Sequence, residues 1–192
     1  MDDGGSAVGR VIIALWVIWF ATWIAAGIFS GRTKVRMGAD MVGPHRALVS
    51  IGVVLLLAQI PWSPDAPLWP EPASIKWILL GLVVAGFAFC WWARLHLGRL
   101  WSGFVTLKED HRIVDTGPYA LVRHPIYSGL IFAALMTALI RASPAALIGY
   151  ALMALGFAMT ARIEERFLRD QLGGEVYDAY SRRVPMLIPR FG

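Results

Sequence analysis

The stretch that decides the fold is GPYALVRHPIYSGLIFAALMTALIRASPAALIGYALMALGFAMTARIEER, residues 117–166. Two apolar runs in it are separated only by Arg141-Ala142-Ser143-Pro144, and a charged cluster lies at each outer side. A helix needs roughly 20 mostly apolar residues to cross a bilayer. The stretch therefore predicts a helical hairpin in a membrane, with both charged clusters at the same end of the hairpin.

The whole chain has the composition of a membrane protein. Of its 192 residues, 57% are hydrophobic and 16% are charged, and the mean hydropathy is +0.59. Uncharged runs predict five transmembrane helices, over residues 11–31, 47–63, 77–93, 126–140 and 142–161. Since the fourth run is short, we expect its helix to start at Pro125 and to continue to about Arg141. The predicted fold class is all-α: a five-helix integral membrane protein with a cytoplasmic connecting segment and a C-terminal amphipathic helix.

The positive charges predict the orientation, because Lys and Arg accumulate on the cytoplasmic side of a membrane. If the N-terminus lies outside, all 18 Lys and Arg residues fall in cytoplasmic segments except Arg10, Lys76 and Arg141. The motif, the C-terminus and all four His residues then face the cytoplasm. The net charge of +5 favours anionic lipid headgroups as the binding partner, and we predict no nucleic-acid partner.

The chain divides into two regions of different character. Residues 1–93 form an N-terminal membrane region of three spans with ordinary loops, and nothing in them points to chemistry. Residues 94–192 form the catalytic region, with two spans, a cytoplasmic connection and a C-terminal helix. Long polar connections in compact proteins are often functional, and this connection of about thirty residues is interrupted by apolar residues. We expect it to fold over the membrane surface.

The RHPIY motif has the features of an anion-binding helix start. Pro125 suits the first position of a helix, which makes His124 the N-cap and leaves the next backbone amides without intrahelical partners. His124, Tyr127 and Ser128 share one helix face. Arg123 adds a charge that can grip a carboxylate at two points. The same residues are equally consistent with a plain helix start flanked by interfacial anchors.

The Glu164-Glu165 pair at the end of a membrane helix requires partners for its charges. Glu165 has Arg162 three residues before it and Arg169 four residues after it, which predicts ion pairs along one helix face. Glu164 has no Arg four residues away and points about 100° from Glu165. Glu164 is therefore the better candidate for gripping an ammonium group or a ribose diol.

A short amphipathic helix is predicted after Gly173-Gly174. Tyr177, Tyr180 and Arg183 fall on one face of it, and Val184-Pro185 ends it. Two interpretations remain open on the residues alone. The helix either contributes to a binding site or lies on the lipid headgroups as a surface anchor.

Taken together, these motifs resemble a known family. A GPYxxxRHPxYxG segment entering a membrane helix, a helical hairpin, an EE pair, Tyr-x-x-Tyr-x-x-x-Val-Pro and a terminal Pro are similar to the isoprenylcysteine carboxyl methyltransferase family and its phospholipid methyltransferase relatives. The resemblance covers roughly residues 96–190. It implies an integral membrane transferase whose S-adenosylmethionine is held on the cytoplasmic side by the last two spans and the C-terminal segment. The five-span plan resembles the smaller, largely prokaryotic members, which implies a prokaryotic plasma membrane.

Carried over position by position, the resemblance implies cofactor and catalytic roles for Arg123, His124, Pro125, Tyr127, Glu164 and Glu165. We predict that the catalytic residues are Arg123, Tyr180 and Arg183 and that the cofactor-binding residues are His124, Pro125, Tyr127, Glu164 and Glu165, with no metal. From the chemistry of the cofactor, we expect His124 and the helix-start amides to hold its carboxylate, Glu164 or Glu165 its ammonium or ribose, and Tyr127 its adenine. Arg123 or Arg183 would orient the acceptor anion.

The expected reaction is methyl transfer to a lipophilic acceptor, the carboxylate of an isoprenylcysteine-like molecule. The acceptor tail would enter sideways from the bilayer past Trp91, Trp92 and Trp101. A phospholipid amine is the alternative acceptor. An NADPH-dependent reductase of the sterol reductase type shares an RHPxY-like pattern and is a further alternative, although this chain is short for one. A metal-dependent membrane hydroxylase requires HxxxH or HxxH pairs, which this sequence does not contain.

Overall fold

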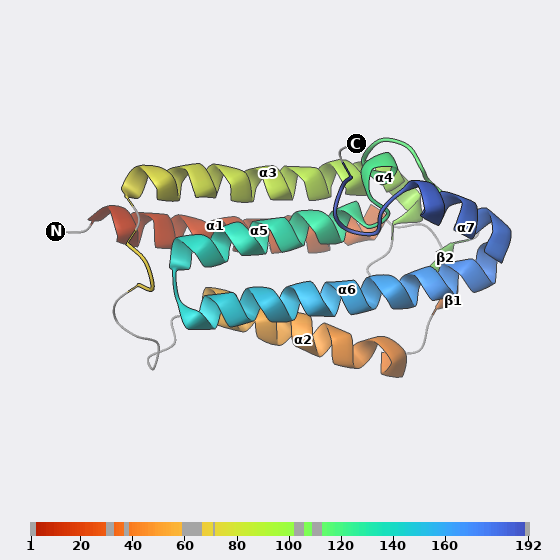
Figure 1. Ribbon diagram of the computed structural model, residues 1–192, viewed down its shortest axis with the longest axis horizontal. Helices are drawn as coiled ribbons and strands as arrows, with labels where there is room; N and C mark the ends of the chain where they lie inside the picture. The colour runs from red at the N-terminus through yellow and green to blue at the C-terminus, as the bar shows by residue number, and fades with distance from the viewer. Residues whose placement is uncertain are drawn as a thin grey trace.

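The computed structural model describes residues 3–29, 33–36, 39–58, 67–70, 72–101, 106–108 and 113–190. Its elements in chain order are α1 (Asp3–Ala26), η1 (Gly27–Phe29), β1 (Thr33–Arg36), α2 (Ala39–Leu57), α3 (Ala73–Leu97), η2 (Gly98–Leu100), β2 (Thr106–Lys108), α4 (Pro118–Leu121), α5 (Pro125–Arg141), α6 (Pro144–Leu172) and α7 (Gly174–Arg183). Helices α1, α2, α3, α5 and α6 run along one axis, and α4, α7, β1 and β2 gather at one end (Figure 1). The predicted helical fold is confirmed.

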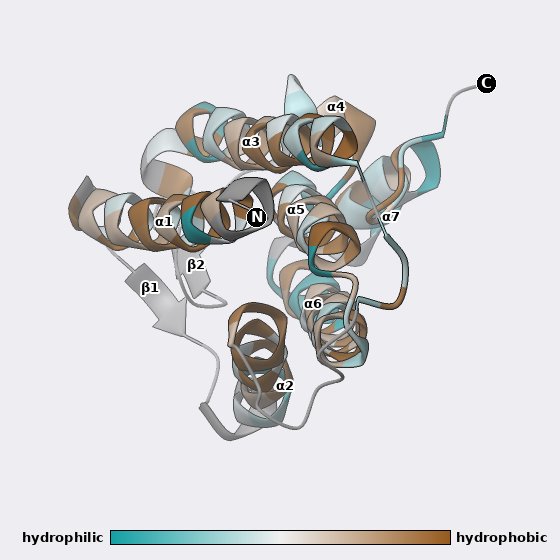
Figure 2. Cartoon of the chain, turned by 90° about the vertical axis from the view of Figure 1, so that its left-hand side faces the viewer, coloured by the Kyte–Doolittle hydropathy of each residue, from teal (hydrophilic) through white to brown (hydrophobic). Residues whose placement is uncertain are grey.

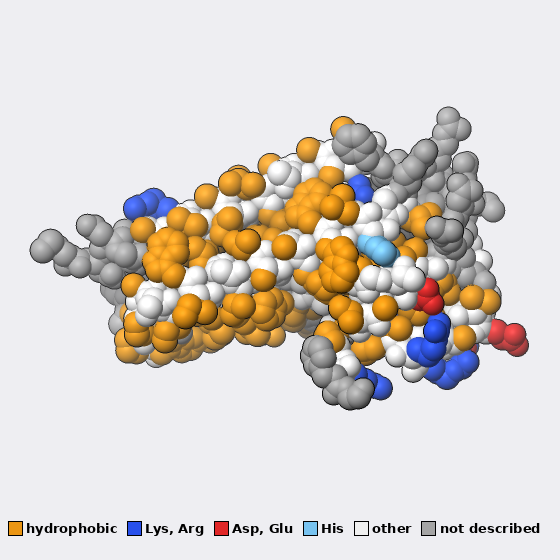
Figure 3. All heavy atoms as spheres, turned by 90° about the horizontal axis from the view of Figure 1, so that it is seen from above, with side chains coloured by type: hydrophobic (Ala, Val, Ile, Leu, Met, Phe, Trp, Pro, Cys, Tyr) orange, Lys and Arg blue, Asp and Glu red, His pale blue; other side chains and the backbone are white. Residues whose placement is uncertain are grey.

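The long helices have the length and composition of membrane spans. Among the described residues, the segments Ala7–Ala26, Ala73–Leu97 and Pro144–Gln171 are long and apolar enough to cross a bilayer. The apolar segments Gly43–Leu57 and Pro125–Arg141 are shorter. Apolar side chains cover much of the bundle surface in Figure 3, whereas most of the charged side chains visible there lie toward one end. Three of the five predicted spans thus meet the criteria for a membrane-crossing helix.

Close approach of glycines holds the bundle together as two helix pairs. Helix α3 packs on α5, and α2 packs on α6. A Cβ atom added to Gly86 would lie 2.9 Å from the carbonyl oxygen of Gly129, and one added to Gly149 would lie 2.6 Å from that of Gly52. Small residues at such crossings are the usual means of helix association in lipid, because they allow the backbones to approach closely.

Helix α1 packs against the α3–α5 pair through its aromatic side chains. The Trp16 ring meets the Phe87 ring edge-on, with centroids 4.9 Å apart, and its Nε1 donates a hydrogen bond of 3.1 Å to Thr137 Oγ1 on α5. Seen end-on in Figure 2, α1 lies beside α3 while α2 lies beside α6. The two N-terminal helices therefore pack on different partners.

The α5–α6 hairpin has the turn that its sequence predicts. Helix α5 begins at Pro125 and ends at Arg141, as expected. Ala142 adopts the left-handed conformation, with φ 45°, and the Ser143 hydroxyl accepts a hydrogen bond of 3.2 Å from the Ala146 amide to cap α6. The turn returns the chain so that both ends carrying charged clusters lie together.

A two-stranded antiparallel sheet was not expected from the sequence. Strand β1 pairs with β2, with Val35 opposite Leu107, and so joins the loop after α1 to the connection after α3. Thr and Val favour strands, but segments of three and four residues are too short for a periodic signal. His111 in the same connection lies outside the described residues.

Candidate functional site

The segment before the motif turns sharply around a histidine. Gly117 has φ +57°, and a Cβ atom there would lie 2.7 Å from the His96 ring, so both backbone conformation and space require glycine. The His96 Nε2 and Thr116 Oγ1 atoms are hydrogen bonded at 2.8 Å. This turn starts α4, whose Tyr119 is buried, and directs the chain toward Arg123.

The C-terminal segment docks on the motif through backbone hydrogen bonds. The amides of Arg123 and His124 donate to the carbonyl oxygens of Pro185 and Met186 at 2.9 and 3.1 Å. One turn into α5, the Ser128 hydroxyl donates to the Leu187 carbonyl oxygen at 2.6 Å. The segment after α7 is thereby held against the start of α5.

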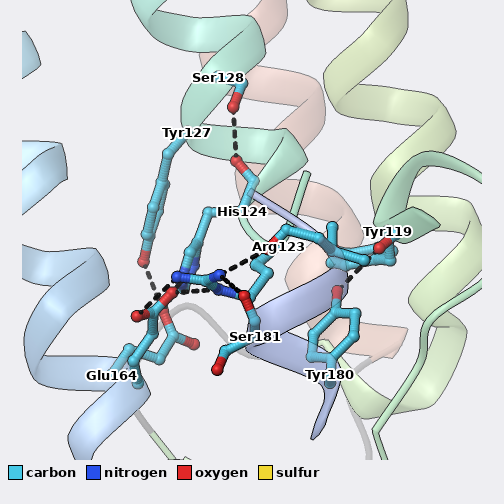
Figure 4. A network of polar contacts seen from close by, with 10 residues as sticks. Tyr119, Arg123, His124, Tyr127, Ser128, Glu164, Tyr180 and Ser181 are labelled. Carbon is cyan, nitrogen blue, oxygen red and sulfur yellow. Dashed lines mark hydrogen bonds and ion pairs between the residues drawn. The ribbon is translucent and has the colours of Figure 1, made fainter. Parts of the chain in front are cut away.

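The two adjacent carboxylates of α6 meet the motif in different ways (Figure 4). Glu165 forms a two-point ion pair with Arg123, at 2.7 and 3.1 Å, and lies 3.1 Å from His124 Nε2. Glu164 accepts a hydrogen bond of 3.1 Å from the Tyr127 hydroxyl and lies 3.7 Å from His124 Nδ1. His124 thus lies between the two carboxylates, with one ring nitrogen toward each.

The prediction of which residues pair with Glu165 was wrong. The sequence spacing predicted ion pairs with Arg162 and Arg169, but Glu165 pairs with Arg123 and His124, while Arg169 binds Asp178 on α7 with two hydrogen bonds of 2.8 Å. Tertiary partners replaced the local ones because docking of the motif brings a buried guanidinium next to Glu165. Burial alone would lower the pKa of Arg123, but hydrogen bonding to Glu165 and its charge outweigh this effect and raise it.

Tyr127 lies within a stack of three rings. Its centroid is 5.4 Å from that of His124, with the rings nearly parallel at 4°, and 5.1 Å from that of Phe157 on α6. The Tyr127 ring therefore has two ring neighbours. In this arrangement its hydroxyl also positions Glu164.

Helix α7 contributes two buried tyrosines. Tyr177 and Tyr180 pack with Val184 against Ile113 and Leu168. The Tyr180 hydroxyl donates to the carbonyl oxygen of Tyr119 at 2.8 Å. Burial raises the pKa of Tyr177 and of Tyr180 well above the usual range, so both phenols remain protonated at neutral pH.

Arg183 lies apart from these tyrosines. Its Nη2 donates a hydrogen bond of 3.2 Å to Asp115, and its side chain is 67% exposed. Because α7 buries only its tyrosine side, the predicted shared face of Tyr177, Tyr180 and Arg183 is realised for the two tyrosines alone.

A cavity of about 470 Å³ extends from this polar cluster into the bundle. Six of the eight predicted site residues line it: Arg123, His124, Pro125, Tyr127, Glu164 and Tyr180. Glu165 and Arg183 are not among its lining residues. Pockets for small ligands are typically about 300–1,000 Å³ and largely apolar with a few polar groups, and this cavity has that character.

The far wall of the cavity comes from helices in which no sequence motif indicated a function. Trp16, Trp19 and Trp23 of α1 line it, together with residues of α2. Of the three tryptophans expected along the acceptor path, only Trp101 is a lining residue. The four-residue spacing of Trp19 and Trp23 was visible in the sequence, but on a membrane helix it reads equally as a lipid-facing stripe.

Arg94 holds the aromatic wall in place. Its guanidinium donates to the carbonyl oxygens of Ala26, at 2.8 Å, and Gly98, at 2.9 Å. It also lies 4.0 Å from the centre of the Trp101 ring. A buried charge at the end of a membrane helix is costly unless it is paired, and here carbonyl groups of α1 and η2 provide the partners.

The fold and the site are those of a multi-pass membrane protein with a cavity at the polar end of its helix bundle. The family model of the "Isoprenylcysteine carboxyl methyltransferase (ICMT) family" matches residues 79–170, which include the motif and both carboxylates. Over these residues, 92 of the 192 in the chain, the protein is similar to that family. The protein is therefore a methyltransferase.

Full-length similarity extends beyond the matched region. Protein-S-isoprenylcysteine O-methyltransferase B of Arabidopsis thaliana is 26% identical over 194 residues, covering 98% of this chain and 95% of the relative. The human Protein-S-isoprenylcysteine O-methyltransferase is 30% identical over 126 residues, covering 63% of this chain and 44% of the relative. The Cobalt-zinc-cadmium resistance protein CzcN of Cupriavidus metallidurans is 28% identical over 127 residues, covering 64% of this chain and 52% of the relative.

Proposed function

We propose that the protein uses S-adenosylmethionine to methylate the carboxylate of a lipophilic, isoprenylcysteine-like acceptor. The observation that carries the proposal is the cavity itself, which has Glu164 at its polar end and tryptophans of α1 along its apolar wall. The names of the plant and human relatives support the choice of acceptor. One cavity of this kind has room for a charged cofactor next to an oily acceptor.

The residues of the polar end fit the proposed cofactor. Within the described ranges, Glu164 is the one acidic residue that lines the cavity, and its side chain is 28% exposed, so it can accept hydrogen bonds from an ammonium group or a ribose diol. Tyr127 and His124 fix its position. Pro125 starts α5, and the backbone amides that follow it suit the cofactor carboxylate.

The proposed reaction depends more on positioning of the reacting groups than on general acid or base catalysis. When bound, S-adenosylmethionine supplies a methyl group that passes to an acceptor carboxylate oxygen as the sulfonium S–C bond breaks and a C–O bond forms, leaving S-adenosylhomocysteine. An ionised carboxylate needs no deprotonation, so alignment of the reacting groups and exclusion of water dominate. Arg123 and Tyr180 serve this purpose by holding the C-terminal segment and α7 against α4 and α5.

We propose that the two regions of the chain contribute different parts of the cavity. Residues 94–192 provide Glu164 and the motif residues, and residues 1–93 add the tryptophans of α1 to the apolar wall for the acceptor tail. We propose that the tail enters from the bilayer between α1 and α2, because Phe20 of α1 and Val53 of α2 both line the cavity. This path replaces the expected one past Trp91 and Trp92.

We also propose that all five bundle helices cross the membrane. Helices α2 and α5, with 19 and 17 residues, are roughly 28 and 26 Å long at 1.5 Å per residue. A hydrocarbon core is about 30 Å thick, and both helices run parallel to the three longer spans (Figure 1). The charge distribution supports an outside N-terminus and a cytoplasmic site, and the five-span plan of the smaller, largely prokaryotic family members supports a prokaryotic plasma membrane.

Titration of the detergent-purified protein with S-adenosylhomocysteine tests the proposed cofactor. We expect saturable binding that Glu164→Gln weakens by about tenfold or more, because a charge-assisted hydrogen bond is lost. Glu175→Gln is the matched control, since Glu175 is an exposed acid of α7 away from the cavity. It should bind like the wild type.

Two results would overturn the proposal. The first is folded wild-type protein that binds NADPH and not S-adenosylhomocysteine, which would favour a reductase. The second is a protein that methylates a phospholipid amine and not a prenylated cysteine, which would keep the cofactor and replace the acceptor.

A further inference from the structure

The cavity ends inside the helix bundle, on four helices at once. The lining residues farthest from the polar end are Trp16 of α1, Val53 of α2, Leu130 of α5 and Met153 of α6. Among the described residues, none that lies beyond these four on its own helix lines the cavity. We call these four residues the cavity floor.

The cavity closes at this floor. Phe20 is 37% exposed, whereas Trp16, one turn farther from the polar end, is 0% exposed and Met153 is 1% exposed. Beyond the floor, Ile12 of α1 and Leu56 of α2 are buried in the hydrophobic core. Because protein interiors are close-packed, this core leaves no room for a ligand to reach farther along the bundle.

The crossing of α2 and α6 fixes one side of the floor. A Cβ atom added to Gly52 would lie 2.7 Å from Met153 Cγ and 2.6 Å from the carbonyl oxygen of Gly149. The two helices are therefore already in contact next to Met153. A ligand cannot push Met153 toward α2 without separating the helices.

Trp16 forms the other side, and directed contacts hold its ring in place. Its Nε1 donates a hydrogen bond of 3.1 Å to Thr137 Oγ1, and this hydroxyl donates one of 2.8 Å to the Ala133 carbonyl oxygen. The Trp16 ring also meets the Phe87 ring edge-on. Thr137 is fully buried and is not a lining residue. Since a buried N–H without an acceptor is costly, we expect the indole to keep this orientation when a ligand is bound.

The distance from the polar end to the floor limits the ligand. Glu164 and Met153 are eleven residues apart on α6, or roughly 16 Å at 1.5 Å per residue, which is comparable to the length of an extended farnesyl chain. Phe20, beside the proposed entry, lies one turn nearer to the polar end than Trp16. A longer chain has to bend back toward that entry, because it cannot pass the indole.

We infer that Trp16 sets the upper limit on the length of the isoprenoid chain that the protein accepts. This inference rests on the proposed function. Trp16 is then a specificity-determining residue that contacts the end of the acceptor chain, and Thr137 is a positioning residue that acts through Trp16.

The first test measures wild type with acceptors that differ only in chain length. The probes are N-acetyl-S-geranylcysteine, N-acetyl-S-farnesylcysteine and N-acetyl-S-geranylgeranylcysteine, in the same detergent. A hydrophobic pocket discriminates between ligands of different size by roughly 10- to 200-fold in kcat/KM. We expect kcat/KM for the geranylgeranyl probe to be about tenfold or more below that for the farnesyl probe.

The second test changes the floor. Trp16→Phe replaces the indole with a smaller ring, so we expect the geranylgeranyl and farnesyl probes to approach equal kcat/KM. The affinity for S-adenosylhomocysteine should stay within about twofold of wild type, because the change lies far from the polar end. Trp77→Phe is the matched control, since Trp77 is 50% exposed and is not a lining residue. It should keep the wild-type ratio.

Thr137→Val separates the role of the hydrogen bond from that of the ring. It removes the acceptor of the Trp16 N–H and leaves every lining side chain unchanged. We expect the ratio of kcat/KM for the farnesyl and geranylgeranyl probes to fall between those of wild type and Trp16→Phe. A purely structural effect would instead lower kcat/KM for all three probes by the same factor.

The outcomes distinguish this inference from the proposed function. If wild type neither binds S-adenosylhomocysteine nor methylates any probe, the proposed function fails, and the inference fails with it. If wild type methylates the farnesyl and geranylgeranyl probes equally well, only the inference is overturned. It is also overturned if folded Trp16→Phe keeps the wild-type ratio. If Trp16→Phe does not fold, a wild-type ratio in Thr137→Val decides against the inference.

Discussion

The carboxylates of Glu164 and Glu165 are adjacent on α6 but have different interactions, because their partners lie on different sides of the helix. Glu165 meets a buried guanidinium and a histidine, so its charge is used within the protein. Glu164 meets a tyrosine hydroxyl and faces the cavity, so part of its hydrogen-bonding capacity remains for a ligand. A rotation of about 100° between consecutive residues of a helix is sufficient to separate these roles.

Glu165→Gln should destabilise the protein without removing a ligand contact. The substitution leaves the Arg123 guanidinium with an uncompensated charge and a weaker acceptor, and hydrogen bonds to charged groups contribute roughly 2 kcal/mol each. We expect the midpoint of thermal unfolding in detergent, followed by tryptophan fluorescence, to fall by about 5 °C. Glu175→Gln should leave it unchanged. Equal midpoints for all three proteins would show that the pair contributes no more than a surface ion pair.

At the scale of elements, the segment after α7 completes the site. It accepts hydrogen bonds from the amides of Arg123 and His124 and from the hydroxyl of Ser128. The two amides precede the first residue of α5, so they are not part of the backbone hydrogen bonds within that helix. The segment therefore acts as a strap across the N-terminus of α5. We therefore expect binding of the proposed methyl donor to depend on this segment even where the segment does not touch the ligand.

Truncation after Arg183 should abolish S-adenosylhomocysteine binding, because it removes every carbonyl acceptor that the strap offers to the motif. Truncation after Arg190 keeps those acceptors and is the control. We expect titration to show wild-type affinity for the longer protein and no saturable binding for the shorter one, with helical circular dichroism similar for both. Full affinity in the shorter protein would show that the motif holds its shape without the strap.

The crossing of α2 with α6 stabilises the bundle. A Cβ atom at Gly149 would meet the Gly52 carbonyl oxygen and the Leu56 amide nitrogen, both at 2.6 Å. We therefore expect Gly149→Ala to separate the helices and to lower the free energy of unfolding by about 1–3 kcal/mol, measured by thermal unfolding. Gly81→Ala, with no heavy atom within 4 Å of the added Cβ, should be neutral. A neutral Gly149→Ala would contradict the close crossing.

The sequence predicts well what is local to one helix and poorly what lies across from it. The start of α5 at Pro125 and the hairpin turn follow from capping and proline chemistry, and the motif residues follow from their shared helix face. The partners of Glu165 do not follow, because spacing along α6 favours its own arginines over Arg123 of another segment. The lining residues of α1 and α2 do not follow either, since nothing in their sequence neighbours indicates that these helices face a cavity.

At the scale of the whole molecule, the residues of the candidate site lie at one end of the bundle. The long helices form an apolar body, and the strands, α4 and α7 collect at the end where the motif and both carboxylates meet (Figure 1). At the opposite end the loop before α3 is joined to the α5–α6 turn by a hydrogen bond of 2.7 Å from the Leu68 amide to the Ala142 carbonyl oxygen. The two ends of the bundle should therefore face different compartments.

Cysteine labelling in intact bacterial cells tests this orientation. Leu68 is 48% exposed at the loop end, and Glu175 is exposed on α7 at the site end. We expect a membrane-impermeant maleimide to label Leu68→Cys in intact cells and Glu175→Cys only after lysis, because positive charges keep the site end in the cytoplasm. The native Cys90 is buried in α3, so wild type should stay unlabelled and serve as the control. Labelling of Glu175→Cys in intact cells, with Leu68→Cys protected, would reverse the orientation and place the site outside.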